Sequence, residues 1–284
     1  MRERCITVVI TCFNNSNYIK ECITSVLIQR KVELEVIVID DCSSDDSVDK
    51  IRGLLDGRPY CYLVQNQKNM GVAASRNKGL FEASAEFITF LDGDDFYANS
   101  LKLFWEVSLL NKMRISNRQN IIAFTRHMYS DSMGRPIHGT PLLPSFLYKK
   151  IFFLLRLVHL PRDFVCSTKL VKSIKGYDES CNLYEDWDYK VRLISKANFI
   201  MASTQFGSVY RKHPKGISRA PRLKLYQALT YYFKKNCDDK LYFFLLPIHT
   251  ILFFLISPVS SAYYKLCGYF NWKTLKIDRR DIIK

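Results

Sequence analysis

The sequence predicts an α/β fold, an open and mostly parallel sheet flanked by helices. Three nearly continuous apolar, β-branched runs occur in the first hundred residues: Cys5–Thr11, Leu34–Asp40 and Glu86–Leu91. Such runs are typical of the interior strands of a parallel sheet that is covered on both faces. Segments with helical spacing separate them, and this alternation indicates an open α/β sheet. A hydrophobic content of 48% over 284 residues is sufficient for a sizeable core.

The remaining elements follow in order between these runs. The apolar stretch before Asn14 is too short for the core and cleavage site of a signal peptide, so it is expected to be the first strand. The next segment has apolar residues at helical spacing, and Ser16 or Asn17 can cap it. Its apolar positions are Ile19, Ile23, Val26 and Leu27. The later expectations are a helix over Asp46–Leu55, a strand over Tyr60–Gln65 and a helix from about Val72 to Ala83.

Nine cysteines are distributed along the chain without any C-x-x-C pair. Their number is odd, and most of them lie inside apolar runs. This pattern predicts reduced, buried thiols, as in a cytosolic protein.

The formal charge of +15 is distributed unevenly along the sequence. Residues 1–110 carry a net charge of −4, whereas residues 111–284 carry +19. A basic half of this kind can face nucleic acid, an anionic membrane surface or a phosphate-rich ligand, and charge alone does not choose among them.

Three carboxylates crowd the end of the run FITFLDGDDFY, at Asp92, Asp94 and Asp95 around Gly93. Carboxylates this close repel one another and are costly to desolvate, so they need solvent, a helix dipole or a cation. One interpretation is a polar turn in which an aspartate caps a helix that starts near Asn99. The other is a site for a hard divalent cation.

Polar residues also follow the other two predicted strands. In parallel sheets the carboxyl ends of the strands meet at one edge, where ligands bind. A nucleotide at this edge needs a ring to stack on, a carboxylate for its donors and a metal beside its diphosphate, and Phe13, Asp41 and Asp94 are of the right types. In the alternative reading, Phe13 belongs to the core and Asp41 caps the helix after CSSDD.

Five segments in this order resemble family 2 glycosyltransferases of the GT-A fold. They are VVITCFNNSNYI, VIVIDDCSSDDS, NMGVAASRNKGL, FITFLDGDDF and NLYEDWDYKVRL. The resemblance spans about residues 5 to 215. It implies a Rossmann-like nucleotide-binding half over residues 1–110 and an acceptor half over 111–220, which together form a GT-A domain over 1–220.

The resemblance also implies roles for individual residues. Those expected to bind the donor are Thr11, Phe13, Asp40, Asp41, Arg76, Asp92 and, in the later loop VYRKHPKGIS, Arg211. Asp94 is expected to ligate Mn²⁺ or Mg²⁺ together with diphosphate oxygens, with His213 as a further candidate ligand. For Arg211 and His213 the alternative is a surface loop with incidental charges.

The segment YEDWDYKVRLI supplies the expected catalytic carboxylate. By resemblance Asp186 is the general base that takes the proton of an acceptor hydroxyl, with Glu185 and Trp187 on the acceptor side. Such a reaction is a direct displacement that inverts the anomeric centre. Alternatively, Glu185 and Asp186 are acidic first-turn residues that interact favourably with the helix dipole.

The C-terminal region 221–284 is expected to be helical, basic, apolar and membrane-associating. Residues 241–264 contain no formal charge and are long enough to cross a bilayer, but Pro247, His249 and Pro258 interrupt them. A kinked interfacial hairpin or a buried helix would look similar; the basic and aromatic flanks favour membrane contact. Residues 144–162 are expected to form an interfacial helix over the acceptor site.

These expectations combine into one function. The chain is expected to be an inverting, metal-dependent enzyme that moves a sugar from a nucleoside diphosphate, with UDP favoured, to a membrane-held saccharide or polyprenyl-linked acceptor. The setting is surface polysaccharide (O-antigen or capsule) biosynthesis, on the cytoplasmic face of the cell membrane. The alternatives are a processive synthase, although the sequence contains no Q-x-x-R-W, and a non-catalytic membrane-associated or nucleic-acid-binding protein.

Overall fold

A computed structural model describes residues 5–140, 160–181 and 185–213, together with residue 227. The expected membrane-associated tail over 241–264 lies outside these residues, as does almost all of the expected interfacial helix over 144–162. Among the residues described, no helix is long and apolar enough to cross a membrane.

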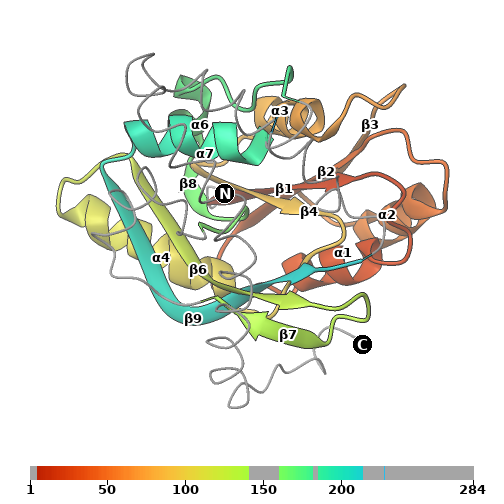
Figure 1. The fold of residues 1–284 in the computed structure, drawn as a ribbon, viewed down its shortest axis with the longest axis horizontal. Helices are drawn as coiled ribbons and strands as arrows, with labels where there is room; N and C mark the ends of the chain where they lie inside the picture. The colour runs from red at the N-terminus through yellow and green to blue at the C-terminus, as the bar shows by residue number, and fades with distance from the viewer. Residues whose placement is uncertain (1–4, 141–159, 182–184, 214–226, 228–284) are drawn as a thin grey trace.

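The described strands form a single nine-stranded sheet, in the order β3-β2-β1-β4-β8-β6-β9-β5, with β7 paired to β6 (Figure 1). From β3 to β4 the pairing is parallel, and β8 then runs antiparallel to both β4 and β6. The strands are β1 (Ile6–Cys12), β2 (Leu34–Asp40), β3 (Cys61–Gln65), β4 (Phe87–Asp92), β5 (Phe96–Tyr97), β6 (Ile121–Ser130), β7 (Pro136–Gly139), β8 (Val165–Ser167) and β9 (Phe199–Arg211).

Helices cover both faces of this sheet. The helices are α1 (Ile19–Leu27), α2 (Ser47–Leu55), α3 (Val72–Glu82), α4 (Lys102–Ile115), α6 (Thr168–Ser173) and α7 (Glu185–Lys196). One apolar core joins the sheet to α3, α6 and α7, and a second joins the opposite face to α1, α2 and α4. Figure 1 shows α3, α6 and α7 on one side of β1 and β4, with α1 and α2 on the other.

The central strand β1 shows why these residues form a two-sided sheet. Val9 belongs to the core under α3 and α7, whereas Val8 and Ile10 belong to the core on the face of α1. All seven residues of β1 are buried, as expected for a strand covered on both faces. Helix α3 approaches so closely that a Cβ on Gly79 would lie 2.2 Å from a methyl carbon of Val9. The predicted α/β fold is confirmed.

The expected elements of the first hundred residues are also present, with boundaries that differ by one or two residues. The expected cap of the first helix is wrong. Tyr18 is the N-cap of α1 and makes no side-chain capping hydrogen bond. The preceding segment is instead tied to the loop after β2, where the Ser16 amide donates to Asp45 Oδ2 (3.1 Å). The seven cysteines described are free thiols, as predicted, but the expectation that they are buried is correct only for Cys12, Cys22 and Cys166, and Cys42 is exposed.

Candidate active site

Strands β1, β2 and β4 end at the same edge of the sheet. In the parallel register Thr11 pairs with Asp92, and the next residue of β1, Cys12, pairs with Asp40. The prediction that three strands bring polar residues to one edge is therefore confirmed.

The turn after β4 lies directly against the end of β1. The amide of Gly93 donates to the carbonyl oxygen of Thr11 (2.8 Å), and a Cβ at position 93 would also lie 2.8 Å from that oxygen. Only glycine fits this close approach. The three carboxylates around it, Asp92, Asp94 and Asp95, each offer an oxygen within 4.8 Å of the others. Hard oxygen ligands in this arrangement suit Mn²⁺ or Mg²⁺.

Two arginine side chains, the buried Arg76 and the partly exposed Arg162, form ion pairs with two of these carboxylates. Asp92 Oδ1 lies 2.6 Å from Arg76 Nη2, and Arg162 contacts both Asp92 Oδ2 (2.8 Å) and Asp95 Oδ2 (2.7 Å). Burial alone would raise the pKa of Asp92, but the guanidinium groups of Arg76 and Arg162 hold the pKa of this carboxyl well below its usual range. Asp92 is therefore an anion at neutral pH.

The two expected metal ligands lie side by side, although they are 119 positions apart in the sequence. His213 Nε2 is 2.7 Å from Asp94 Oδ2, and the Tyr18 ring packs against the imidazole with 5.1 Å between ring centroids. A carboxylate beside an imidazole is a chemically suitable pair of ligands for Mn²⁺. Their role in binding a metal stays a prediction.

Arg76 connects this cluster to the start of α7. Its side chain is only 3% exposed, and Nη1 lies 2.9 Å from Glu185 Oε1 while Nη2 contacts Asp92. The guanidinium also stacks over the Tyr177 ring, with 4.9 Å to the centroid. A buried arginine thus fixes the distance between the turn after β4 and the expected catalytic segment.

The pKa values of Glu185 and Asp186 are shifted in opposite directions although the two residues are neighbours. Burial raises the pKa of Glu185, only partly opposed by Arg76. Burial acts on Asp186 in the same sense, but Lys190, whose Nζ lies 3.0 Å from Asp186 Oδ2, and then Arg162 lower the pKa of that carboxyl below its ordinary value. A general base must be deprotonated to act, so Asp186 is the better suited of the two.

Some of the residues expected around the nucleobase are exposed or lack a hydrogen-bond partner among the residues described, whereas others already make hydrogen bonds within the protein. Phe13 is 46% exposed at the sheet edge, so the alternative that it belongs to the core is wrong. Thr11 Oγ1 is 3.5 Å from Asp92 Oδ1. Asp40 Oδ2 accepts from the Ser43 amide (3.0 Å), while the buried Asp40 Oδ1 has no partner among the residues described.

Asp41 makes hydrogen bonds that neither interpretation of the sequence included. Its Oδ1 accepts from Asn66 Nδ2 and the Met70 amide, and its Oδ2 accepts from the Gly71 amide, each at 2.8 Å. Asp41 therefore holds the loop that leads into α3, and it does not cap α2. A donor contact would have to be made in addition to these bonds.

The side chain of Arg211, like that of Asp41, already has hydrogen-bond partners within the protein. Its Nε donates to the Asp94 carbonyl oxygen (2.8 Å), and its Nη2 pairs with Glu21 Oε2 (2.7 Å). The side chain is buried, so the surface-loop alternative is wrong for this residue, and its role as a diphosphate contact stays a prediction. Trp187, expected on the acceptor side, packs against the core shared by α3, α6 and α7, and Lys190 Nζ lies 6.0 Å from its ring centroid; its role stays a prediction.

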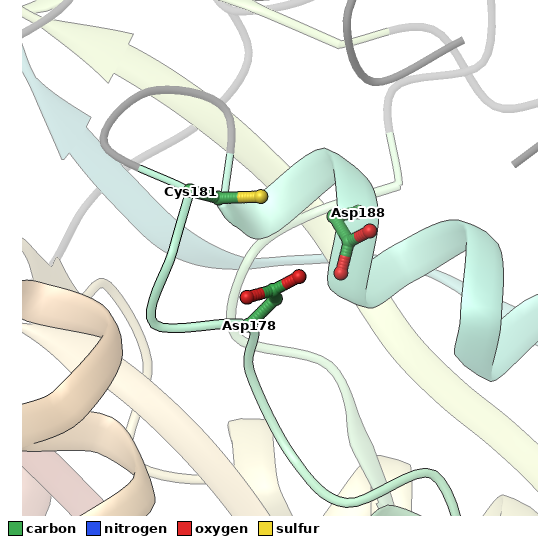
Figure 2. A group of neighbouring side chains, drawn as sticks. All are labelled: Asp178, Cys181 and Asp188. Carbon is green, nitrogen blue, oxygen red and sulfur yellow. The ribbon is translucent and has the colours of Figure 1, made fainter. Parts of the chain in front are cut away.

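A second group of potential ligands, Asp178, Cys181 and Asp188, lies in the loop before α7 and in its first turns (Figure 2). Arg192 already neutralises Asp188 at 2.6 Å and donates to the carbonyl oxygens of Ile174 and Gly176. Asp188 and Arg192 therefore tie α7 to the turn after α6.

The family model for glycosyl transferase family 2 matches residues 7–154, just over half of the chain. The chain belongs to glycosyl transferase family 2. One curated relative, the GalNAc(5)-diNAcBac-PP-undecaprenol β-1,3-glucosyltransferase of Campylobacter jejuni, is 40% identical over 92 residues, which are 32% of this chain and 29% of that protein. The chain spans less than half the length of the curated relatives that it matches.

Solved structures show the fold of this family 2 chain as GT-A. Residues 1–349 of S. aureus TarS in complex with UDP align with a TM-score of 0.66 at 18% identity, covering 97% of this chain and 77% of that one. The mannosyltransferase PcManGT from Pyrobaculum calidifontis, in complex with GDP-Man and Mn²⁺, aligns with a TM-score of 0.60 at 14% identity and the same coverage.

Two residues of the site were not identified from the sequence. The sequence indicates Asp95 only as part of an acidic cluster, and Arg162 only as the last residue of the expected interfacial helix over 144–162. The dipeptide Arg162–Asp163 immediately precedes the apolar residues Phe164–Cys166. A charged pair at the start of a buried strand is a signal that could have pointed to a buried ion-pair partner.

Proposed function

We propose that the chain catalyses inverting transfer of a sugar from a nucleoside diphosphate sugar to an acceptor hydroxyl. The observation that carries this proposal is the link made by Arg76, which joins Asp92 of the carboxylate cluster to Glu185 at the start of α7. Because of this link, the edge suited to a nucleotide and a metal lies beside the carboxylate suited to activating an acceptor.

In the proposed mechanism each group has one task. The exposed ring of Phe13 stacks on the nucleobase, and Asp40 Oδ1 accepts a hydrogen bond from the base or ribose. Asp94 and His213, with Asp92 nearby, hold a divalent cation. When bound, that cation stabilises the negative charge of the leaving diphosphate.

The chemical step is assigned to Asp186. Its carboxylate takes the proton of the acceptor hydroxyl while the oxygen forms a bond to the anomeric carbon, on the face opposite the breaking bond to the diphosphate. The configuration inverts in this single displacement, and no enzyme carboxylate has to form a covalent intermediate. Lys190 keeps Asp186 deprotonated between turnovers.

We further propose UDP as the nucleotide of the donor and a membrane-held saccharide or polyprenyl-linked acceptor. Support comes from the UDP complex of TarS and from the undecaprenol-linked substrate in the name of the Campylobacter relative. The net charge of +19 over residues 111–284 suits an anionic membrane surface, on the cytoplasmic side where nucleotide sugars are made available. In this scheme residues 1–220 form the transferase domain and residues 221–284 make the membrane contact.

The test is a panel of nucleotide sugars offered to the full chain with and without Mn²⁺. A ligand that binds only the folded state raises the melting temperature by mass action. We expect one donor to raise the melting temperature in the presence of Mn²⁺ and to be hydrolysed slowly without an acceptor. A panel in which no nucleoside diphosphate sugar shifts the melting temperature would reject the proposed function.

A further inference from the structure

Arg162 contacts the carboxylates that a divalent cation would need. Its guanidinium bridges Asp92 Oδ2 at 2.8 Å and Asp95 Oδ2 at 2.7 Å, immediately before β8. These two aspartates are also two of the three whose oxygens lie within 4.8 Å of one another. The guanidinium of Arg162 therefore already offsets part of the negative charge of the cluster.

The backbone at Arg162 is fixed more firmly than its side chain. The next residue, Asp163, is 1% exposed; its Oδ2 pairs with Lys102 Nζ (2.9 Å), and its Oδ1 accepts from Tyr210 Oη (2.7 Å). The carbonyl oxygen of Asp163 accepts from Thr89 Oγ1 (2.9 Å), and the Arg162 amide donates to Tyr210 Oη. The Arg162 side chain, by contrast, is 37% exposed. It can change partners without moving the chain that carries it.

The charges at the site favour movement of Arg162 away from Asp92 and Asp95 only when a divalent cation enters together with a diphosphate. A divalent cation that enters alone must compete with Arg162 for Asp92 and Asp95. A cation that enters with a diphosphate brings anionic oxygens, and guanidinium groups bind phosphate oxygens well, often through two hydrogen bonds. Displacement of Arg162 from the carboxylates is then compensated by new ion pairs.

We propose that Arg162 is a positioning residue that holds the carboxylate cluster in the ligand-free protein and shifts to the donor diphosphate when metal and nucleotide bind together. The inference rests on the proposed function. In this proposal Arg162 competes with the metal for the carboxylates but binds the nucleotide. Its removal should therefore raise the affinity for the metal alone and lower the affinity for the nucleotide. Damage to the fold alone would weaken both.

The experiment measures binding of Mn²⁺ alone, and then of a nucleoside diphosphate with Mn²⁺, to the full chain by titration calorimetry. The nucleotide is whichever of UDP, GDP and dTDP raises the melting temperature of the parent. For Arg162→Gln we expect Mn²⁺ alone to bind roughly 3-fold to 10-fold more tightly, the scale of one half-exposed ion pair. We expect the nucleotide with Mn²⁺ to bind about 10-fold more weakly, as for a lost charge-assisted hydrogen bond.

Two further variants serve as controls. Arg162→Lys keeps the charge but not the two-pronged geometry, so both affinities should lie between those of the parent and of Arg162→Gln. Arg114→Gln removes an exposed arginine that pairs with Glu86, just before β4 at the end of that strand away from the cluster, and should change neither affinity.

The outcomes separate this inference from the proposed function. If the parent binds nucleotide with Mn²⁺ but Arg162→Gln changes both affinities in the same direction or neither, the inference is overturned and the proposed function stands. If neither the parent nor Arg162→Gln binds Mn²⁺ under any condition, the inference and the proposed function are both overturned. Tighter Mn²⁺ binding by Arg162→Gln, with weaker nucleotide binding, supports the inference.

Discussion

The two halves of the sheet bring residues to the same site by different means. The parallel half contains β3, β2, β1 and β4, and the mixed half contains β8, β6, β9 and β5. In the parallel half β1, β2 and β4 run in the same direction and in register, so their carboxyl ends meet through local chain direction alone. In the other half the pairing is mixed, and residues reach the site through ion pairs and hydrogen bonds between distant positions. Arg76 and Glu185 are 109 positions apart, and Arg211 and the Asp94 carbonyl are 117 apart. The strand pattern thus specifies the edge formed by β1, β2 and β4, whereas contacts of buried charged side chains bring the residues of the other half to it.

The largest effect is expected where buried ion pairs hold α4 against the mixed half of the sheet. Lys102 is fully buried, with its Nζ 2.9 Å from both Glu106 Oε2 and Asp163 Oδ2. Lys102→Met would leave these two carboxylates without their cation, and removal of one partner from a buried ion pair costs about 3–5 kcal/mol. We expect the free energy of unfolding to fall by that amount in denaturant titration. Lys112→Met, at an exposed position of the same helix, is the matched control and should stay within about 0.5 kcal/mol of the parent.

A loss in Lys112→Met as large as that in Lys102→Met, or no loss in Lys102→Met, would show that the fold does not depend on these buried ion pairs.

The next largest effect should distinguish chemistry from binding at the start of α7. Asp186→Asn removes the proposed base while leaving the donor edge intact, so turnover should fall by at least ~10²-fold with donor affinity nearly unchanged. Glu185→Gln should be milder, because the amide oxygen can still accept from Arg76. Steady-state kinetics with a donor and acceptor pair give the order of the two effects. A larger loss for Glu185→Gln would move the base by one residue, and an effect of neither would remove base catalysis from this segment.

A smaller effect is expected from Lys190, which acts on the chemistry only through Asp186. Lys190 lowers the pKa of Asp186, so Lys190→Met should raise it. Activity requires the deprotonated carboxylate and is lost as the pH falls through its pKa. The acidic limb of the pH–rate profile should therefore move to higher pH, with little change at alkaline pH. A uniform loss of activity at all pH values would instead indicate a purely structural role for Lys190.

The difference between the parallel and mixed halves of the sheet also explains which features could be predicted from the sequence. The strand runs and the polar residues that follow them are local patterns, and they correctly placed Thr11, Asp40 and Asp92 at one edge. The family resemblance brought Asp94 and His213 together as candidate ligands, and the structure places them in contact. These predictions needed only chain direction and short segments.

The partners of the charged residues could not be predicted in the same way. Nothing near Arg162 in the sequence shows that it contacts Asp92 and Asp95, because the contact depends on how β8 packs beside β4. Likewise, the hydrogen bonds of Asp41 to the loop before α3 depend on tertiary structure. Residue type gave the charge, whereas only the fold determined which opposite charge it meets.

The central claim, that the cluster after β4 binds a metal for a nucleotide, is tested most directly by Asp94→Asn. The measurement is nucleotide affinity with and without Mn²⁺, for the parent, for Asp94→Asn and for Asp49→Asn, an exposed control on α2. We expect Mn²⁺ to tighten nucleotide binding by the parent and the control but not by Asp94→Asn, whose melting temperature without ligand should stay close to that of the parent. Equal affinity of Asp94→Asn and the parent in the presence of Mn²⁺ would contradict the account.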